Sequence, residues 1–189
     1  MKTPKAANEY DDIDEFDDPI NCQCLIANLN NCDNVWTSWV SAGPFRAWLG
    51  HLAAGTGYTA EAVAIACNMP PATGRALAHH QRAAKHIRWI DAHRLLNMDI
   101  KTLEWLGKAN GETGPAHRAL SELGTWRPEP AKLAAKLGIS LADAQGLLNG
   151  TLRTHQRAVL WHCIAYAQDI MYKRTRFGRG KISDLPAAA

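Results

Sequence analysis

Short amphipathic stretches, each bounded by residues that favour helix ends, run through the chain from about residue 44 to residue 172. In residues 44–55 the apolar side chains follow the i, i+3, i+4, i+7 spacing of one helix face. Further helices are expected at residues 60–67, 71–77, 89–98, 115–123, 128–137, 141–149 and, capped by Thr154, up to about residue 172. Thr59 and Ser140 are the expected caps of the helices that begin at residues 60 and 141, and the expected stops after residues 67, 137 and 149 are Asn68, Gly138 and Gly150. No stretch shows sustained apolar–polar alternation, so we expect no strands and predict an all-α fold.

The two halves of this helical region resemble each other. Residues 63–69 align with residues 133–139, and the tetrapeptide His-Gln-Arg-Ala occurs at 80–83 and again at 155–158. The distance between the two matched segments is five residues longer in the second half, which predicts an insertion there after the third helix. A period of about 70–75 residues is too long for a solenoid and indicates two related small domains.

Residues 132–150 have the spacing of a helix-turn-helix motif. The small side chain of Ala134 lets the second helix approach the first, and Gly138 permits a tight turn. Apolar residues would fill the wedge between the helices: Leu133, Leu137, Ile139 and Leu147. In the first half, residues 63–77 supply the matching small residue, turn residue and apolar wedge residues. In DNA-binding pairs of this kind the second helix lies in the major groove.

On these residues the chain resembles two groups of DNA-binding proteins. Residues 132–167, with "LGIS" and "NG" before another helix, look like the phage-repressor (Xre-type) family. The first half, with Ile87, Arg88, Ala92 and the Leu95–Leu96 pair at its end, resembles helix-turn-helix proteins of actinobacteria and their phages. The resemblance covers about residues 40–176. It implies tandem helix-turn-helix units and sequence-specific DNA binding without a cofactor.

The resemblance also implies which side chains face the groove. In the first unit these are Pro70, Pro71, Ala72, Thr73, Arg75, Ala76 and His79, and Arg75 suits a guanine edge. In the second they are Ser140, Leu141, Ala142, Asp143, Gln145, Gly146 and Asn149, and Gln145 suits adenine. The second helix carries no cation, so a packing or dimerisation role stays open for it.

Cations beside these helices are expected to contact phosphates. The set comprises Arg82, Lys85, Arg88, Arg153, Lys173, Arg174, Arg176 and Arg179. A solvated surface is the alternative for each cluster. We expect four segments: an acidic, largely disordered arm with a cysteine strap (1–34), two helix-turn-helix domains (35–108 and 109–172), and a basic flexible tail (173–189).

The net charge of +3 conceals a segregation. Residues 1–19 hold seven acids against two lysines, a net of −5, and the remaining residues carry +8. The basic part fits a polyanionic partner, and the arm either competes with that partner or only aids solubility. The acidic N-terminus does not resemble a secretory signal, and no apolar run spans a bilayer. We therefore expect a cytoplasmic protein without membrane contact.

Other kinds of site have weaker support. Cys22, Cys24 and Cys32 lack the second ligand pair that a zinc site usually has, so free thiols are the main expectation. The histidines at 79, 80, 86 and 93 accompany no metalloenzyme pattern, so we expect no enzymatic activity. The seven tryptophans are expected mainly in the core, although Trp36 and Trp39 could form an exposed partner site.

Taken together, these patterns predict a double-stranded DNA-binding transcription regulator of the phage or mobile-element repressor type. The first alternative is an interaction module that binds a polymerase subunit or another regulator, favoured by the acidic arm and the cation-poor second reading helix. The second is a nucleic-acid enzyme or metalloprotein built on the histidines and cysteines. A homodimer or a partner from the transcription machinery stays open.

Overall fold

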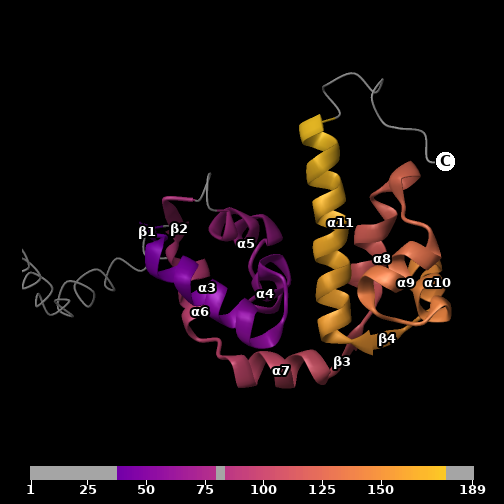
Figure 1. The fold of residues 1–189 in the computed structure, drawn as a ribbon, viewed down its shortest axis with the longest axis horizontal. Coiled ribbons are helices and arrows are strands. Elements are labelled where there is room, and N and C mark those ends of the chain that lie inside the picture. Colours follow the sequence, from indigo (N-terminus) through magenta and orange to yellow (C-terminus); the bar gives the residue numbers. More distant parts are fainter. Residues whose placement is uncertain (1–37, 80–83, 178–189) are drawn as a thin grey trace, which may run out of the picture. The chain divides into compact units, whose positions relative to one another are not determined.

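The structure, a computed structural model, describes residues 38–79 and 84–177. Within these ranges the chain from Trp39 onward forms one compact unit. The prediction of an all-α fold is confirmed, because almost all of the regular structure is helical (Figure 1). None of the described helices has the length and apolar character needed to cross a membrane. The expected acidic arm (1–34) lies outside the described residues.

The first half runs through two strands and five helices. In order these are β1 (Trp39–Ser41), α3 (Gly43–Thr56), α4 (Ala60–Ala66), α5 (Pro71–Ala78), β2 (His86–Arg88), α6 (Trp89–Leu96) and α7 (Ile100–Lys108). Thr59 caps α4 by accepting a hydrogen bond from the N–H of Ala62, as expected. Asn68, with φ of 55°, makes the left-handed turn that the sequence predicts after α4.

The second half has two strands, four α-helices and a short 3-10 helix. In order these are β3 (Asn110–Glu112), α8 (Gly114–Ser121), η1 (Gly124–Trp126), α9 (Pro130–Leu137), α10 (Leu141–Asn149), β4 (Thr154–Gln156) and α11 (Arg157–Phe177). Ser140 caps α10 through the N–H of Asp143, as its sequence position predicts. Gly138 and Gly150 end α9 and α10 with φ of 67° and 72°, which confirms both predicted stops.

Both halves follow one plan of strand, helices, returning strand and helix. β1 pairs antiparallel with β2, and β3 pairs antiparallel with β4. Ala42 and Thr113 precede α3 and α8 with the same φ of −81° and ψ of −11°. The N–H of each donates to the residue before the returning strand, Lys85 at 2.9 Å and Arg153 at 3.1 Å. In each half, this hydrogen bond joins the residue before the first helix to the residue before the returning strand.

The strand pairs correct the expected alignment of the halves. The turn residues Met69 and Ile139 do match, since each donates its N–H to the alanine five residues before it. The strand starts His86 and Thr154 then match at an offset of 68, two less than the offset of 70 at the turn. The His-Gln-Arg-Ala anchor and the insertion of five residues are therefore wrong. Residues 80–83 lie outside the described part of the chain.

Several element boundaries also differ from the expectation. The four three-residue strands were not expected, because three residues are too few to show alternation. Thr154 lies in β4 instead of capping the last helix, and that helix continues beyond residue 172 to Phe177. The helix expected from residue 128 begins at Pro130. Helix α7, which Asp99 caps, was not expected from the sequence.

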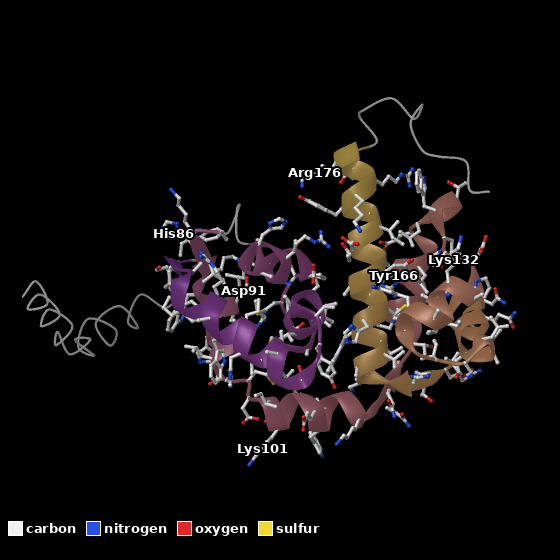
Figure 2. All side chains as sticks on the ribbon, viewed as in Figure 1. His86, Asp91, Lys101, Lys132, Tyr166 and Arg176 are labelled. Carbon is white, nitrogen blue, oxygen red and sulfur yellow. The ribbon has the colours of Figure 1, made fainter. Side chains whose placement is uncertain are left out.

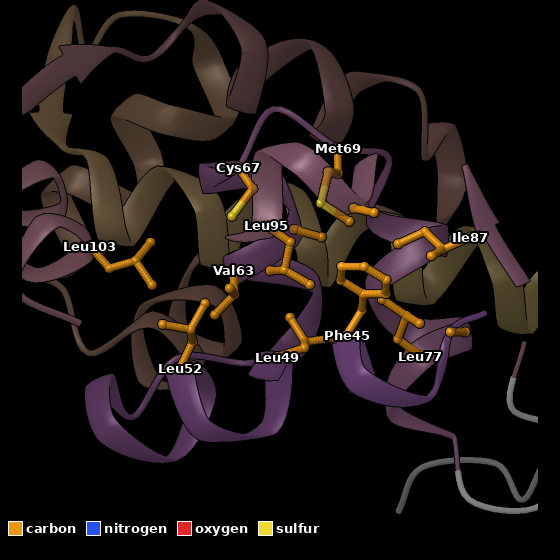
Figure 3. Close-up of a cluster of buried hydrophobic side chains, with 13 residues drawn as sticks. Phe45, Leu49, Leu52, Val63, Cys67, Met69, Leu77, Ile87, Leu95 and Leu103 are labelled. Carbon is orange, nitrogen blue, oxygen red and sulfur yellow. The ribbon is translucent and has the colours of Figure 1, made fainter. Parts of the chain in front are cut away.

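Each half has its own hydrophobic cluster. The first gathers side chains from α3 to α7, among them Leu49, Leu77 and Leu95 (Figure 3). The second gathers side chains from α8 to α11, among them Leu120 and Leu147. Helix α11 links the halves, because it packs against α4 and α7 as well as α8 and α9. The same helix therefore belongs to the second cluster and touches the first helix-turn-helix pair.

The tryptophans do not follow the expected core placement. Trp48 packs against the first cluster, but the side chains of Trp105, Trp39 and Trp126 are 70%, 66% and 45% exposed. Their exposure arises because α7, β1 and η1 are short elements at the rim of the clusters, with one face toward solvent. Trp36 lies outside the described residues.

Candidate nucleic-acid interface

In both helix-turn-helix pairs the second helix approaches the first through small residues. On α5, Gly74 lies so close to α4 that an added Cβ would come within 2.5 Å of the Ala60 carbonyl oxygen and 2.8 Å of the Ala64 Cβ. At the matching position of α10, Ala144 is fully buried. Close approach of the helices fixes which side of α5 and of α10 faces outward.

The expected reading face of α5 is only partly open. Pro70, Ala72 and His79 are exposed, whereas Pro71, Thr73 and Ala76 are partly buried. The decisive residue is Arg75, whose side chain is only 15% exposed. Among the groove-facing positions inferred for this helix, the one cation is therefore largely withdrawn from solvent.

Arg75 is engaged on two sides. Its Nε donates to Glu61 Oε1 of α4 at 3.3 Å. Its guanidinium carbon also lies 4.5 Å from the centre of the Tyr172 ring of α11, a cation–π geometry. Its Nη2 is buried and has no hydrogen-bond partner within the described ranges. A guanine edge could reach Arg75 only if Tyr172 moved, so the structure does not present Arg75 as a ready base reader.

The cations that follow α5 differ in exposure and in their ion-pair partners. Lys85 is exposed, and Arg82 lies outside the described residues. Arg88 donates to the Oδ2 of Asp91 at 3.1 Å, and Arg94 lies 3.8 Å from the Oδ1 of the same carboxylate. Asp91 is almost fully buried at the start of α6 (Figure 2). Arg88 thus helps to neutralise a buried acid, and its side chain remains 46% exposed.

Helix α10 presents an open face. Ser140, Leu141, Ala142, Gln145 and Asn149 are exposed, while the intervening residues Ala144, Gly146, Leu147 and Leu148 are buried. Among these, the side chain of Leu141 is 51% exposed. The exposed set combines amide, hydroxyl and methyl groups, the side-chain chemistry that reads adenine and thymine in a major groove.

Asp143, the acid on this helix, already has partners. Ser140 Oγ donates to its Oδ2 at 2.7 Å, and the Nε2 of His155 lies 3.9 Å from the same oxygen. His155 belongs to β4, so this contact ties the returning strand to the start of α10. An open, polar hollow separates the two elements, and Asn110, Thr154 and Gln156 also line it.

Cations lie near the C-terminal end of α10 and on α9. Arg127 donates to the carbonyl oxygen of Leu148 near the end of α10. Arg153, in the loop that follows α10, is exposed and makes no ion pair with any described residue. On α9, Lys132 is 71% exposed and lies 3.4 Å from Glu129 (Figure 2). The sequence reading missed Arg127 because only the fold brings it beside α10.

The expectation of a flexible tail from residue 173 is wrong for residues 173–177, which are helical. Lys173, Arg174 and Arg176 belong to the last turns of α11, while Arg179 lies outside the described residues. Lys173 pairs with Asp169 at 2.7 Å, and Arg176 donates to the Tyr172 hydroxyl at 3.3 Å. A basic helix end therefore stands beside the ring that covers Arg75 (Figure 2).

A small cavity of about 120 Å³ lies where α4, α9 and α11 meet. Ionisable residues from all three helices line it: Glu61, Lys136, His162 and Asp169. Burial lowers the pKa of His162 below its ordinary value of 6.5, and the charge of Lys136 lowers it further. His162 also meets the Tyr58 ring edge-on, with the ring centres 5.5 Å apart.

We expect acid to destabilise the fold through His162. Because its native pKa is depressed, the unfolded chain binds the proton first, and stability falls as the pH drops through 6.5. In urea unfolding between pH 7.5 and 5, the free energy of unfolding should fall less for His162→Gln than for the wild type. The exposed His86→Gln is the control and should keep the wild-type profile. An unchanged profile in His162→Gln would contradict the assignment.

Nothing in the described residues forms a metal site. No group of three or more His, Cys, Asp or Glu side chains there could hold a metal ion. Cys22, Cys24 and Cys32 fall outside the described ranges. Burial raises the pKa of both Cys67 and Cys163 to about 12, so these two thiols stay protonated near neutral pH and are poor nucleophiles.

Comparison with family models, curated proteins and solved structures found no match to this chain.

Proposed function

We propose that the chain binds double-stranded DNA in a sequence-specific manner and acts as a transcription regulator. The observation that carries the proposal is the second helix-turn-helix pair, whose outer helix α10 exposes Gln145 and Asn149, with the cation Arg127 near its C-terminal end and Arg153 in the loop that follows. Groove-facing amides discriminate bases, and flanking guanidinium groups bind phosphates. A role as a phage or mobile-element repressor rests on the sequence resemblance.

Charge supports the same partner. The described residues carry sixteen Lys and Arg against nine Asp and Glu, a net of +7. An excess of this sign attracts a polyanion and speeds its encounter with the protein. Several of these cations, such as Arg153 and Arg157, are exposed and lack an ion-pair partner among the described side chains.

The second candidate is a protein-interaction module. The observation that favours it is the exposure of Trp105, 70%, together with that of Trp39. Large exposed aromatic side chains are typical anchors of protein interfaces. In that case binding would depend on Trp105 and would respond weakly to salt, whereas DNA binding would respond strongly.

The experiment compares two exposed cations in a duplex-binding assay. Arg153→Gln should weaken binding to all duplexes alike and make the dependence of log affinity on log salt shallower by about one. Lys101→Gln, on α7 of the first half, is the matched control and should change neither quantity (Figure 2). Fluorescence anisotropy with a labelled random-sequence duplex measures both. Equal effects of the two substitutions would contradict a DNA surface around α10.

A further inference from the structure

The two helix-turn-helix pairs differ in how accessible their outer helices are. Helix α11 (Figure 1) packs against α4. Its Tyr172 ring lies over the Arg75 guanidinium of α5. A helix entering a major groove needs its outer face clear, because the groove is only about 12 Å wide. In this structure α11 therefore stands where DNA would approach Arg75.

The contacts of Arg75 are those of a structural residue. The ion pair with Glu61 joins α5 to α4, and the ring of Tyr172 joins the same guanidinium to α11. Both carboxylate and guanidinium are largely buried, with 22% and 15% of their side chains exposed. Removing one partner of such a pair leaves the other charge poorly solvated, so the cluster stabilises the packing in which Tyr172 covers Arg75.

Helix α10 has no comparable cover. Its buried residues face α8 and α9, and its exposed residues lie along the opposite side. Figure 1 shows α10 at the right-hand edge of the view, with α9 between it and α11. The segment from Arg127 to Arg157 carries five cations against Glu129 and Asp143, and both of these acids have partners.

We propose that α10 alone is the DNA-reading helix, and that α5 has a structural role, because its Arg75 packs against Tyr172 of α11. This inference rests on the proposed function and specifies which helix contacts the DNA. The partner is double-stranded DNA, whose phosphates match the cations around α10 and whose groove matches its exposed amides. Gln145 reads a base edge, Leu141 and Ala142 contact thymine methyl groups, and Arg153 holds a phosphate.

The chain offers a matched pair of substitutions for the test. Ala72 on α5 and Ala142 on α10 are both exposed and occupy the same position in their helices, 70 residues apart. Glutamate is tolerated near a helix N-terminus, so Ala72→Glu and Ala142→Glu should both fold. The new carboxylate repels DNA only where the helix enters the groove.

Both variants of the full chain are titrated with a labelled random-sequence duplex and with the duplexes that the wild-type chain enriches from a random pool. We expect Ala142→Glu to weaken binding at least about 100-fold and Ala72→Glu to change it less than about threefold. Gln145→Ala should reduce discrimination between enriched and random duplexes by about 5- to 150-fold, whereas Arg75→Gln should leave this ratio unchanged.

The outcomes separate the two proposals. If the wild-type chain binds no duplex, the proposed function and this inference both fail. If the wild type binds but Ala72→Glu is the damaging variant, or both variants bind equally well or equally badly, only the assignment to α10 is overturned. Circular dichroism of each variant confirms that a loss of binding is not a loss of fold.

Discussion

Duplex affinity should fall about 10³- to 10⁴-fold when the salt concentration rises from roughly 50 to 200 mM. Sixteen Lys and Arg against nine Asp and Glu in the described residues leave enough free cations to neutralise roughly five to eight phosphates. Each neutralised phosphate releases counterions, so log affinity should decline with log salt at a slope of about −4.5 to −7. A salt titration followed by fluorescence anisotropy measures the slope directly.

The control for this titration replaces added salt with sucrose of equal osmolality, which should leave the affinity nearly unchanged. A slope shallower than about −2 would mean that no more than two phosphates are contacted. That result would contradict a DNA surface built on the cations around α10. It would favour the protein-interaction alternative, which depends on apolar anchors such as Trp105.

Gly74→Ala should destabilise the fold, although alanine is normally the better helix former. The added Cβ would lie 2.5 Å from the Ala60 carbonyl oxygen and 2.8 Å from the Ala64 Cβ. Neither atom is the end of a flexible side chain, so α4 and α5 must separate. Overpacking of this kind costs about 1–3 kcal/mol in the free energy of unfolding. Urea unfolding followed by circular dichroism measures the loss.

Gly50→Ala is the matched control. Gly50 lies within α3, and an added Cβ would meet nothing within 4 Å. This substitution should stabilise the chain by about 0.5–1 kcal/mol, because alanine loses less backbone entropy in a helix. The two glycine-to-alanine changes should therefore have opposite signs. A Gly74→Ala variant as stable as the wild type would show that the helix pair packs less closely than the structure indicates.

The sequence predicted most helix ends because they depend on local chemistry. Thr59 and Ser140 cap α4 and α10 with their own side chains, and Gly138 ends α9 through its left-handed backbone. These properties need no knowledge of distant residues. The strands could not be predicted in the same way, because β1 and β2 are three residues each and exist through pairing between residues 39–41 and 86–88.

The accessibility of the candidate site could not be predicted from local sequence in the way that the helix ends could. Arg75 has the right chemistry for a base reader, but Tyr172, 97 positions later in the sequence, covers it. No local pattern predicts that contact, since it depends on how α11 packs against α4. The open face of α10 could be anticipated from the spacing of Gln145 and Asn149. The accessibility of one reading helix relative to the other required the tertiary structure.

Selection of bound fragments from a random duplex library tests the central claim most directly. The wild-type chain is incubated with the library at low salt, bound duplexes are recovered over several rounds, and the pools are sequenced. We expect enrichment of a short common sequence, which the Ala142→Glu variant fails to enrich. Recovery of no duplex above background, or of duplexes without any shared sequence, would contradict sequence-specific DNA binding by this chain.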